Sequence, residues 1–391
     1  MTLDFFLAAI LALWWLAALA LHFGSAALAL RQPAMRARLA ANPERPPVSI
    51  LIPIKRAEHA MEAALDGAFG QDYPRFEIIV AAARADAPAL PVAERVRAQF
   101  PGVPSRVIVS ETAVAASPKV NNLARPLDEA AHDHVLILDS NIRLAPDQLG
   151  PFMAHLVPGT GLTVAAQIAV APRGFAAEIE CAFINGYQAR LFLAASALDW
   201  GFGIGKAMLF RRSDFARAGG IPAIARSVLE DHAISKALAR IGLKTVIVGT
   251  VVRQALGRRG WREVWNRQFR WMVCRRFEEP LAHALEPFMG TLAASLAGAG
   301  AASLVGFSPW IVGLGTAGAW FAAEAIFLAR KGWGIRPASP LAWMLREALV
   351  PLMWARAWST STVAWGELRL DVRAGTIAAT ARPARLSAQP D

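Results

Sequence analysis

The sequence predicts an α/β fold, in which a doubly wound sheet of parallel strands lies between membrane helices. Short apolar runs alternate with helical segments from residue 48 to residue 139, which is the pattern of a parallel sheet. The last of these runs, His134 to Leu138, leads directly into an acid, Asp139. Long apolar stretches near both ends of the chain predict the membrane helices.

The composition places the protein at a membrane. Hydrophobic residues make up 55% of the 391 residues and charged residues only 18%, which is too apolar for an ordinary soluble enzyme. The net charge of +11 favours a membrane with anionic headgroups. No basic run is interleaved with aromatics as in nucleic-acid modules, so we expect no nucleic-acid partner. Cys181 and Cys274 lack metal or redox spacing, and we expect buried free thiols.

Residues 1–31 are predicted to be an uncleaved membrane anchor. Phe5 to Leu30 is almost wholly apolar and long enough to cross a bilayer as a helix. A signal peptide would carry positive charge before this run, but Asp4 stands there and several arginines, beginning with Arg31, follow. The positive-inside rule therefore puts the chain after residue 31 in the cytoplasm.

Residues 46–280 are predicted to form the α/β domain. Its expected elements are a strand at 48–53, a helix at 60–69, a strand at 76–82, a helix at 91–100, a strand at 106–109, a helix at 119–131 and a strand at 134–138. The turn at 53–58 has no glycine, which excludes a dinucleotide-binding fingerprint, and no P-loop signature is present. The glycines between Gly201 and Lys206 more simply provide tight backbone turns near a ligand.

Asp139 is the central candidate residue. A buried parallel strand that ends on an acid lifts a carboxylate into the crevice where such sheets bind ligands. Asn141 follows two residues later, and this pair of oxygen ligands suits a hard divalent cation that carries a diphosphate. The alternative is an Asp that caps the following turn, and the spacing leaves both interpretations open.

Two further acidic positions have both a chemical and a structural interpretation. Asp86 lies just past the second strand, where it either contacts a nucleotide base or ribose or shapes a turn. Glu230 and Asp231 open a helix, where they complement its dipole or place a general base at the mouth of a cleft.

The segment from Trp261 to Arg276 is basic and aromatic at helical spacing. Its tryptophans would suit a membrane interface while its arginines meet phosphates. The alternative is an amphipathic helix beside the membrane with no chemical role.

Residues 286–360 are predicted to be membrane helices. Two spans, at about 289–307 and 310–329, are expected on either side of Ser308 and Pro309. Leu341 to Trp358 is apolar but contains charges, so an interfacial helix, a re-entrant helix and a third span all stay open. We expect residues 361–391 to be a peripheral tail with a disordered end.

Taken together, the segments resemble a family-two-type glycosyltransferase with the GT-A fold, and more closely the ceramide glucosyltransferases. The resemblance covers roughly Val48 to Arg276. It is carried, in order, by Val48-Ser49-Ile50-Leu51-Ile52-Pro53, Ser117-Pro118-Lys119-Val120-Asn121-Asn122-Leu123, Asp139-Ser140-Asn141-Ile142-Arg143, Glu230-Asp231 and Arg267-Gln268-Phe269-Arg270-Trp271. The sequence departs from the pattern of this family at two positions. Asp86 is the only aspartate kept at the first acidic site, and Gln188 stands where animal members carry a histidine.

The resemblance implies inverting transfer of a sugar, first of all glucose, from a UDP-sugar to a lipid hydroxyl, first of all that of ceramide. It implies Mg2+ or Mn2+ at Asp139 and Asn141, with Asp231 as the base that takes the acceptor proton. Arg270 would bind the diphosphate, and Trp271 would stack on the acceptor or form the floor of the site. The implied substrate-binding residues are Asp86, Lys119, Asn122, Glu230 and Arg267.

Other functions compete with this expectation. The enzyme could add N-acetylglucosamine or another sugar to a different lipid, such as a phospholipid. A processive polysaccharide synthase would want more spanning helices than this chain shows. A catalytically silent membrane scaffold is disfavoured by the intact acids at Asp139 and Asp231. In every enzymatic case we expect a multi-pass protein of a bacterial-type inner membrane with a cytoplasmic catalytic domain.

Overall fold

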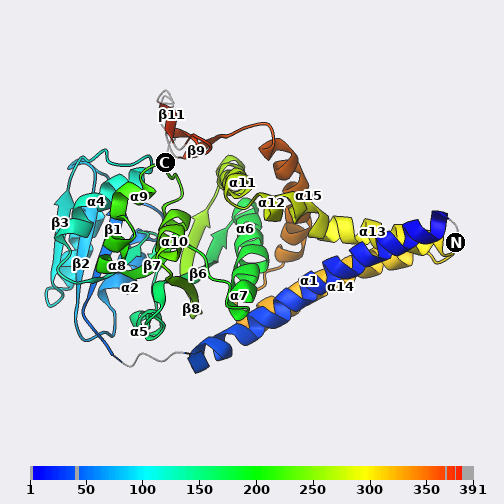
Figure 1. Cartoon of the computed structure of the whole chain (residues 1–391), viewed down its shortest axis with the longest axis horizontal. Helices are drawn as coiled ribbons and strands as arrows, with labels where there is room; N and C mark the ends of the chain where they lie inside the picture. Colours follow the sequence, from blue (N-terminus) through cyan, green and yellow to red (C-terminus); the bar gives the residue numbers. More distant parts are fainter. Residues whose placement is uncertain (1–2, 40–43, 366–367, 375, 381–391) are drawn as a thin grey trace.

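A long helical rod projects from an α/β domain (Figure 1). The computed structural model describes residues 3–39, 44–365, 368–374 and 376–380. The rod consists of α1 (Leu3–Leu39), α13 (Thr291–Leu304) and α14 (Pro309–Lys331). The predicted layout, a folded domain joined to apolar helices from both ends of the chain, is confirmed.

The domain is built on an eight-stranded sheet. Its order is β3-β2-β1-β4-β7-β6-β8-β5. The strands are β1 (Val48–Ile54), β2 (Phe76–Ala82), β3 (Ser105–Val109), β4 (His134–Leu138), β5 (Ile142–Arg143), β6 (Thr160–Arg173), β7 (Ala207–Arg211) and β8 (Lys244–Arg258). The first four strands in this order are parallel, as expected.

The rest of the sheet, which lies outside the 48–139 stretch from which parallel strands were expected, is mixed. Strand β7 is antiparallel to both β4 and β6, and β5 is antiparallel to β8. The chain enters β7 from the loop beside the carboxyl end of β4, so β7 must run in the opposite direction. Residue 206 consequently stands next to residue 139, although 67 residues separate them.

Helices cover both faces of the parallel half, which explains its continuous apolar strands. Ile50 and Ile78 pack on one face, and Leu51 and Ile79 pack on the other. The first face carries α2 (Met61–Phe69), α3 (Leu90–Gln99) and α5 (Leu149–Ala154). The second face carries α4 (Pro118–Glu129), α8 (Arg212–Arg217), α9 (Gly220–Ile224) and α10 (Glu230–Arg240).

A second core joins the domain to the membrane helices. It contains parts of α1, α14 and β6 together with α6 (Phe175–Cys181), the π-helix η1 (Ala182–Ala189), α7 (Arg190–Ala197), α11 (Trp261–Glu278) and α15 (Ser339–Ala357). A buried ion pair lies inside it, where both guanidinium NH groups of Arg346 bind the carboxylate of Glu324 at 2.6 and 2.8 Å. The pair fixes α15 to α14.

Helices α1 and α14 are long and apolar enough to cross a membrane. The expected span at 289–307 is broken, because α12 (Pro280–Leu285) and the 3-10 turn η2 (Glu286–Met289) meet α13 at a bend of 57°. The 14 residues of α13 reach about 21 Å, less than the roughly 30 Å of a hydrocarbon core. Within the described residues there are thus two candidate spans, or three if the bent pair counts as one. Helix α15 is not among them.

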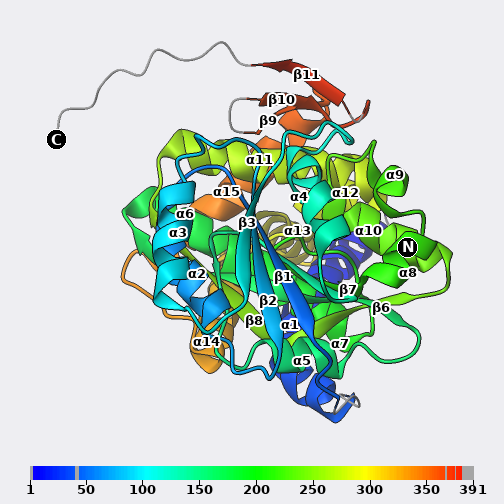
Figure 2. The ribbon, with the colours of Figure 1, turned by 90° about the vertical axis from the view of Figure 1, so that its left-hand side faces the viewer.

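The chain after α15, which was expected to be a peripheral tail, forms a small antiparallel sheet. Its strands are β9 (Thr362–Trp365), β10 (Leu368–Asp371) and β11 (Thr376–Thr380). Figure 2 shows this small sheet lying over α11. The predicted disordered end, residues 381–391, lies outside the described residues.

Candidate active site

Asp139 lies at the carboxyl edge of the parallel strands, where β4 ends beside the start of β7. Its backbone N–H donates to the carbonyl of Lys206 at 3.0 Å. Its carboxylate is held by two ammonium groups, that of Lys119 at 2.6 Å and that of Lys206 at 2.8 Å. Burial opposes ionisation of Asp139, but the two lysines outweigh it and bring its pKa to about 2. Asp139 is therefore a carboxylate whose negative charge is fully matched.

Lys119 joins the Asp139 side of the site to the Glu230 side. It stands in the first turn of α4, whose N-cap is Ser117. Its Nζ contacts Asp139, the Glu230 carboxylate at 2.9 Å and the Gly205 carbonyl at 2.8 Å. An ammonium group has three N–H donors, so these contacts use all of them. The predicted site residues Lys119, Asp139 and Glu230 thus form one connected cluster.

Asp231 lies beside this cluster at the start of α10. The loop of residues 201–206 passes so close that a Cβ on Gly205 would be 2.9 Å from its Oδ2 atom. The N–H of His232 donates to Oδ1 at 2.8 Å. Burial raises the pKa of Asp231 to about 6, and the negative charge of Glu230 adds to the effect. A carboxylate with such a pKa is suited to accept a proton near neutral pH.

Helix α11 provides a cation near these acids. No carboxylate within the described part of the chain lies within ion-pair distance of the Arg270 guanidinium, and burial lowers its pKa. The guanidinium carbon of Arg270 lies over the ring of Trp365 in β9, 5.3 Å from the ring centroid. The next residue, Trp271, packs against a small apolar cluster that contains Ala169 and Leu256. Arg270 is thus a half-buried cation without a matching anion.

Arg267, predicted to bind substrate, is engaged elsewhere. Its Nε atom is 3.2 Å from the carboxylate of Glu180, which is fully buried. Glu263, one helical turn earlier, lies 3.7 Å away. These contacts give Arg267 a place in an internal ion-pair network.

Two other predicted substrate contacts occupy different places. The Asn122 amide donates to the carbonyls of Ile54 at 3.1 Å and Ala81 at 2.9 Å, so it ties α4 to the ends of β1 and β2. Asp86 is 70% exposed and pairs with Arg84 at 2.8 Å. Among the described residues we find no contact between Asp86 and the Lys119 cluster.

The residues for a divalent ion are Asp139 and Asn141. The Asn141 amide nitrogen donates to Glu58 at 2.5 Å, while its Oδ1 atom is buried and has no hydrogen-bond partner in the described structure. The described residues contain no group of three acids, histidines or cysteines that would form a closed metal site. Mg2+ commonly binds through one or two carboxylates, with substrate phosphates and water completing its shell. The donor set fits such an ion.

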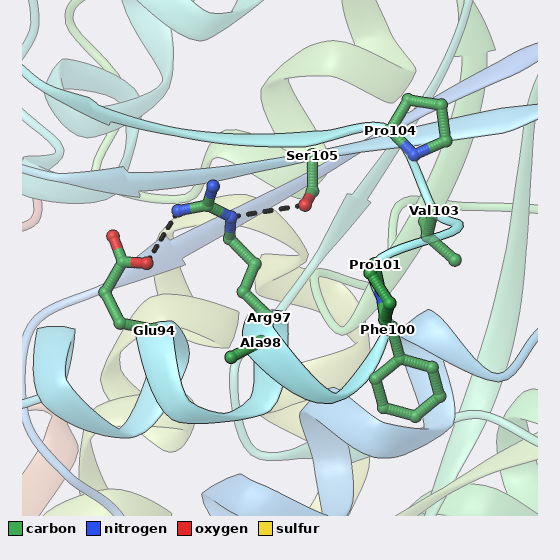
Figure 3. A pocket seen from close by; sticks show the side chains of 8 residues that line it. All are labelled: Glu94, Arg97, Ala98, Phe100, Pro101, Val103, Pro104 and Ser105. Atoms are coloured by element: carbon green, nitrogen blue, oxygen red, sulfur yellow. Dashed lines mark hydrogen bonds and ion pairs between the residues drawn. The ribbon is translucent and has the colours of Figure 1, made fainter.

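A cavity of about 350 Å³ lies away from this cluster (Figure 3). It opens where β3 begins, at the edge of the sheet opposite Asp139. Arg97 in its wall is paired with Glu94 at 2.6 Å and Ser105 at 3.2 Å. Its polar groups are therefore already matched, and it adds nothing to the site.

Sequence reasoning missed Lys206 and the role of Gly205. The sequence feature that could have indicated both is the glycine-rich segment from Gly201 to Lys206, which was interpreted only as a source of backbone turns. The structure shows the close backbone approach: a Cβ on Gly203 would collide with the carbonyl of Asp231. The same loop delivers the Lys206 ammonium to Asp139.

Comparisons with known proteins identify the family of the chain. The model of glycosyl transferase family 21 matches residues 12–378. Ceramide glucosyltransferase 3 of Caenorhabditis elegans is 22% identical over 327 residues, which cover 82% of this chain and 71% of that protein. The ceramide glucosyltransferase of Komagataella phaffii is 33% identical over 140 residues, 35% of this chain and 28% of that protein.

Comparison with solved structures also finds a glycosyltransferase fold. The mannosyltransferase PcManGT from Pyrobaculum calidifontis, solved with GDP-Man and Mn2+, superposes with a TM-score of 0.51 at 21% identity. The match covers 89% of this chain and 99% of that one, and it supports the GT-A-like architecture. The family match spans most of the chain, including both membrane regions and every residue of the cluster, so the chain belongs to glycosyl transferase family 21 and is a glycosyltransferase.

Proposed function

We propose that this enzyme transfers a sugar, first of all glucose, from a UDP-sugar to the hydroxyl of a membrane lipid, first of all ceramide, with inversion. The support from relatives is that the curated proteins similar to this chain are ceramide glucosyltransferases. The observation that carries the proposal is the position of Lys119 between Asp139 and Glu230, directly beside Asp231. A donor-binding acid and an acceptor-activating acid thus lie within one cluster.

On the acceptor side, Asp231 is the proposed base. Inversion requires one in-line displacement, in which the acceptor oxygen attacks the sugar carbon and loses its proton. The raised pKa of about 6 leaves Asp231 ionised at neutral pH and basic enough to take that proton. Contacts with the N–H groups of His232 and Gly205 fix the orientation of the carboxylate.

On the donor side, Asp139 and the buried Oδ1 atom of Asn141 would hold Mg2+ or Mn2+. Such an ion supplies charge neutralisation to the leaving diphosphate. Arg270 has no anion of its own in the described structure, and its planar guanidinium suits two diphosphate oxygens. Trp271, which packs on Ala169 and Leu256, would form the floor of the acceptor site.

The lipid acceptor would reach the site from the bilayer. Side-chain contacts connect the base to the membrane side, since His232, next to Asp231, lies 3.4 Å from Glu279 at the end of α11. Helix α12 follows immediately, and its Leu281 is 73% exposed. The proposal places α1 and α14 in a bacterial-type inner membrane and the domain on its cytoplasmic side, where UDP-sugars are available.

The test is a transfer assay with the purified full chain in detergent–lipid micelles. UDP-glucose, UDP-N-acetylglucosamine and GDP-mannose are each offered with ceramide and with phosphatidylglycerol, and lipid products are identified by mass spectrometry. The proposal predicts hexosylceramide from UDP-glucose that requires Mg2+ or Mn2+. Formation of glycosylated phosphatidylglycerol without hexosylceramide would show that the acceptor is a phospholipid and not ceramide. A lack of any glycolipid product would contradict the proposal.

A further inference from the structure

Two lysines hold Asp139, but they differ in how firmly they are fixed. Lys119 uses its three N–H donors on Asp139, Glu230 and the Gly205 carbonyl. Lys206 makes one contact within the described residues, with the other oxygen of Asp139 at 2.8 Å. Its side chain is also more exposed, at 18% against 12%. Two donors of Lys206 thus remain for another partner.

The backbone beneath Lys206 is fixed even though its side chain has a single partner. Its carbonyl accepts from the Asp139 N–H, and its own N–H donates to Ile204 at 2.9 Å. Gly205, one residue earlier, packs against Asp231. The ammonium group can therefore change partner by side-chain rotation alone, without moving the loop or the base.

The charges of the cluster give a reason for such a change. The cluster contains three cations, Lys119, Lys206 and Arg270, and three acids, but only the two lysines form ion pairs within the described residues. Those acids are Asp139, Glu230 and Asp231. A carboxylate bound by two ammonium groups has few lone pairs left for a divalent ion. An incoming ion must displace one lysine, and a diphosphate brings the negative charge that the displaced lysine then needs.

We propose that Lys206 exchanges partners when the donor binds, leaving the Asp139 carboxylate to the divalent ion and pairing with the diphosphate. This inference rests on the proposed function, because it assumes a nucleoside diphosphate sugar and an ion at Asp139. Lys119 stays in place and keeps Asp139 next to Glu230. Lys206 is thus a donor-binding residue that also prevents Asp139 from attracting a cation when no diphosphate is present.

The exchange predicts opposite effects on two ligands for Lys206→Met. The variant loses one charge-assisted contact with the diphosphate, so UDP in the presence of saturating Mn2+ should bind about tenfold or more weakly. It also removes a cation that competes for Asp139, so Mn2+ alone should bind several-fold more tightly. Both are measured by isothermal titration calorimetry on the full chain in detergent. Lys206→Arg should restore most of the UDP affinity.

The matched control is Lys244→Met, which removes an exposed lysine that pairs with Asp199 at 3.2 Å. It should change neither affinity. Thermal unfolding of both variants checks that the chain is folded. Weaker UDP binding together with tighter Mn2+ binding supports the exchange. Unchanged UDP affinity, or Mn2+ affinity that is unchanged or reduced in a folded Lys206→Met protein, would overturn it.

The same titrations separate this inference from the proposed function. If the wild-type chain binds UDP and Mn2+ but Lys206→Met behaves like it, the exchange is wrong and the donor assignment stands. If the wild-type chain binds neither UDP nor Mn2+, the donor assignment itself fails and the exchange fails with it.

Discussion

Gly205 lies against the carboxylate of Asp231, and a Cβ at residue 205 would stand 2.9 Å from its Oδ2 atom. The carbonyl of the same glycine accepts from Lys119, whose ammonium group also holds Asp139. One small residue therefore touches both the proposed base and the lysine that connects it to the donor acid. The glycine is needed here for space, since side chains have no room between these groups.

Gly205→Ala should reduce activity without unfolding the protein. The added methyl group must push the Asp231 carboxylate aside, and a displacement of about 1 Å at a reacting group costs on the order of 100-fold in rate. The control is Gly102→Ala, where nothing lies within 4 Å of the new Cβ. Transfer rates of the two variants check this, and an unimpaired Gly205→Ala enzyme would argue against Asp231 as the base.

The pH dependence of kcat/KM should show the ionisation of Asp231. A base acts only when deprotonated, so the rate should fall as pH drops below about 6, the raised pKa of this carboxyl. Glu230→Gln removes the negative charge that helps to raise this pKa. The acidic limb should then move to lower pH. If the fall in kcat/KM at low pH occurred at the same pH in Glu230→Gln, a group other than Asp231 would control it.

Arg270 and Arg267, one helical turn apart, should fail in different ways when replaced. Arg270→Ala removes a cation that lacks an ion pair among the described residues, so donor binding and turnover should fall while the unfolding temperature is kept. Arg267→Ala weakens the pairing of the buried Glu180 carboxylate. The free energy of unfolding should fall by about 3 kcal/mol, as when one partner of a buried ion pair is removed. UDP titration and thermal unfolding of both variants distinguish the roles. If Arg267→Ala weakened UDP binding and Arg270→Ala lowered the unfolding temperature, Arg267 would be the donor-binding residue and Arg270 the structural one.

The Arg346–Glu324 pair should be important for assembly of the membrane part. Both side chains are almost fully buried, so Arg346→Met leaves a charged Glu324 unpaired, at a cost of about 3–5 kcal/mol. Adding Glu324→Met should recover part of the loss, because it removes the Glu324 charge, while Glu347, which also pairs with Arg346 at 2.7 Å, still lacks its partner. Thermal unfolding in one detergent measures all three proteins. Equal stability of wild type and Arg346→Met would contradict the structural role.

Much of the fold follows from local sequence patterns. The strand predicted at 76–82 matches β2, and the strand predicted at 134–138 matches β4, because two-sided burial forces continuous apolar runs. The position of Asp139 at a strand end followed from the same pattern. The break at Gly290 was missed, since hydropathy averages over a window and does not register a 57° bend.

The partners of each side chain could not be read from the sequence. Lys206 reaches Asp139 only because β7 runs antiparallel to β4, a pairing that no local pattern reveals. Arg267 and Arg270 fit the motif equally well, but Glu180 lies near one and not the other. The strands after residue 361 are short, and their role depends on contact with α11, as in the packing of Trp365 on Arg270.

The most direct test of the central claim is a comparison of wild type with Asp231→Asn, in which one carboxylate oxygen becomes an amide. UDP binding is measured by calorimetry, and transfer of glucose from UDP-glucose to ceramide is measured as product formed per enzyme. We expect UDP affinity within about twofold of wild type and turnover reduced by about 100-fold or more. If Asp231→Asn keeps most of its turnover, this residue is not the base and the account of the site is wrong.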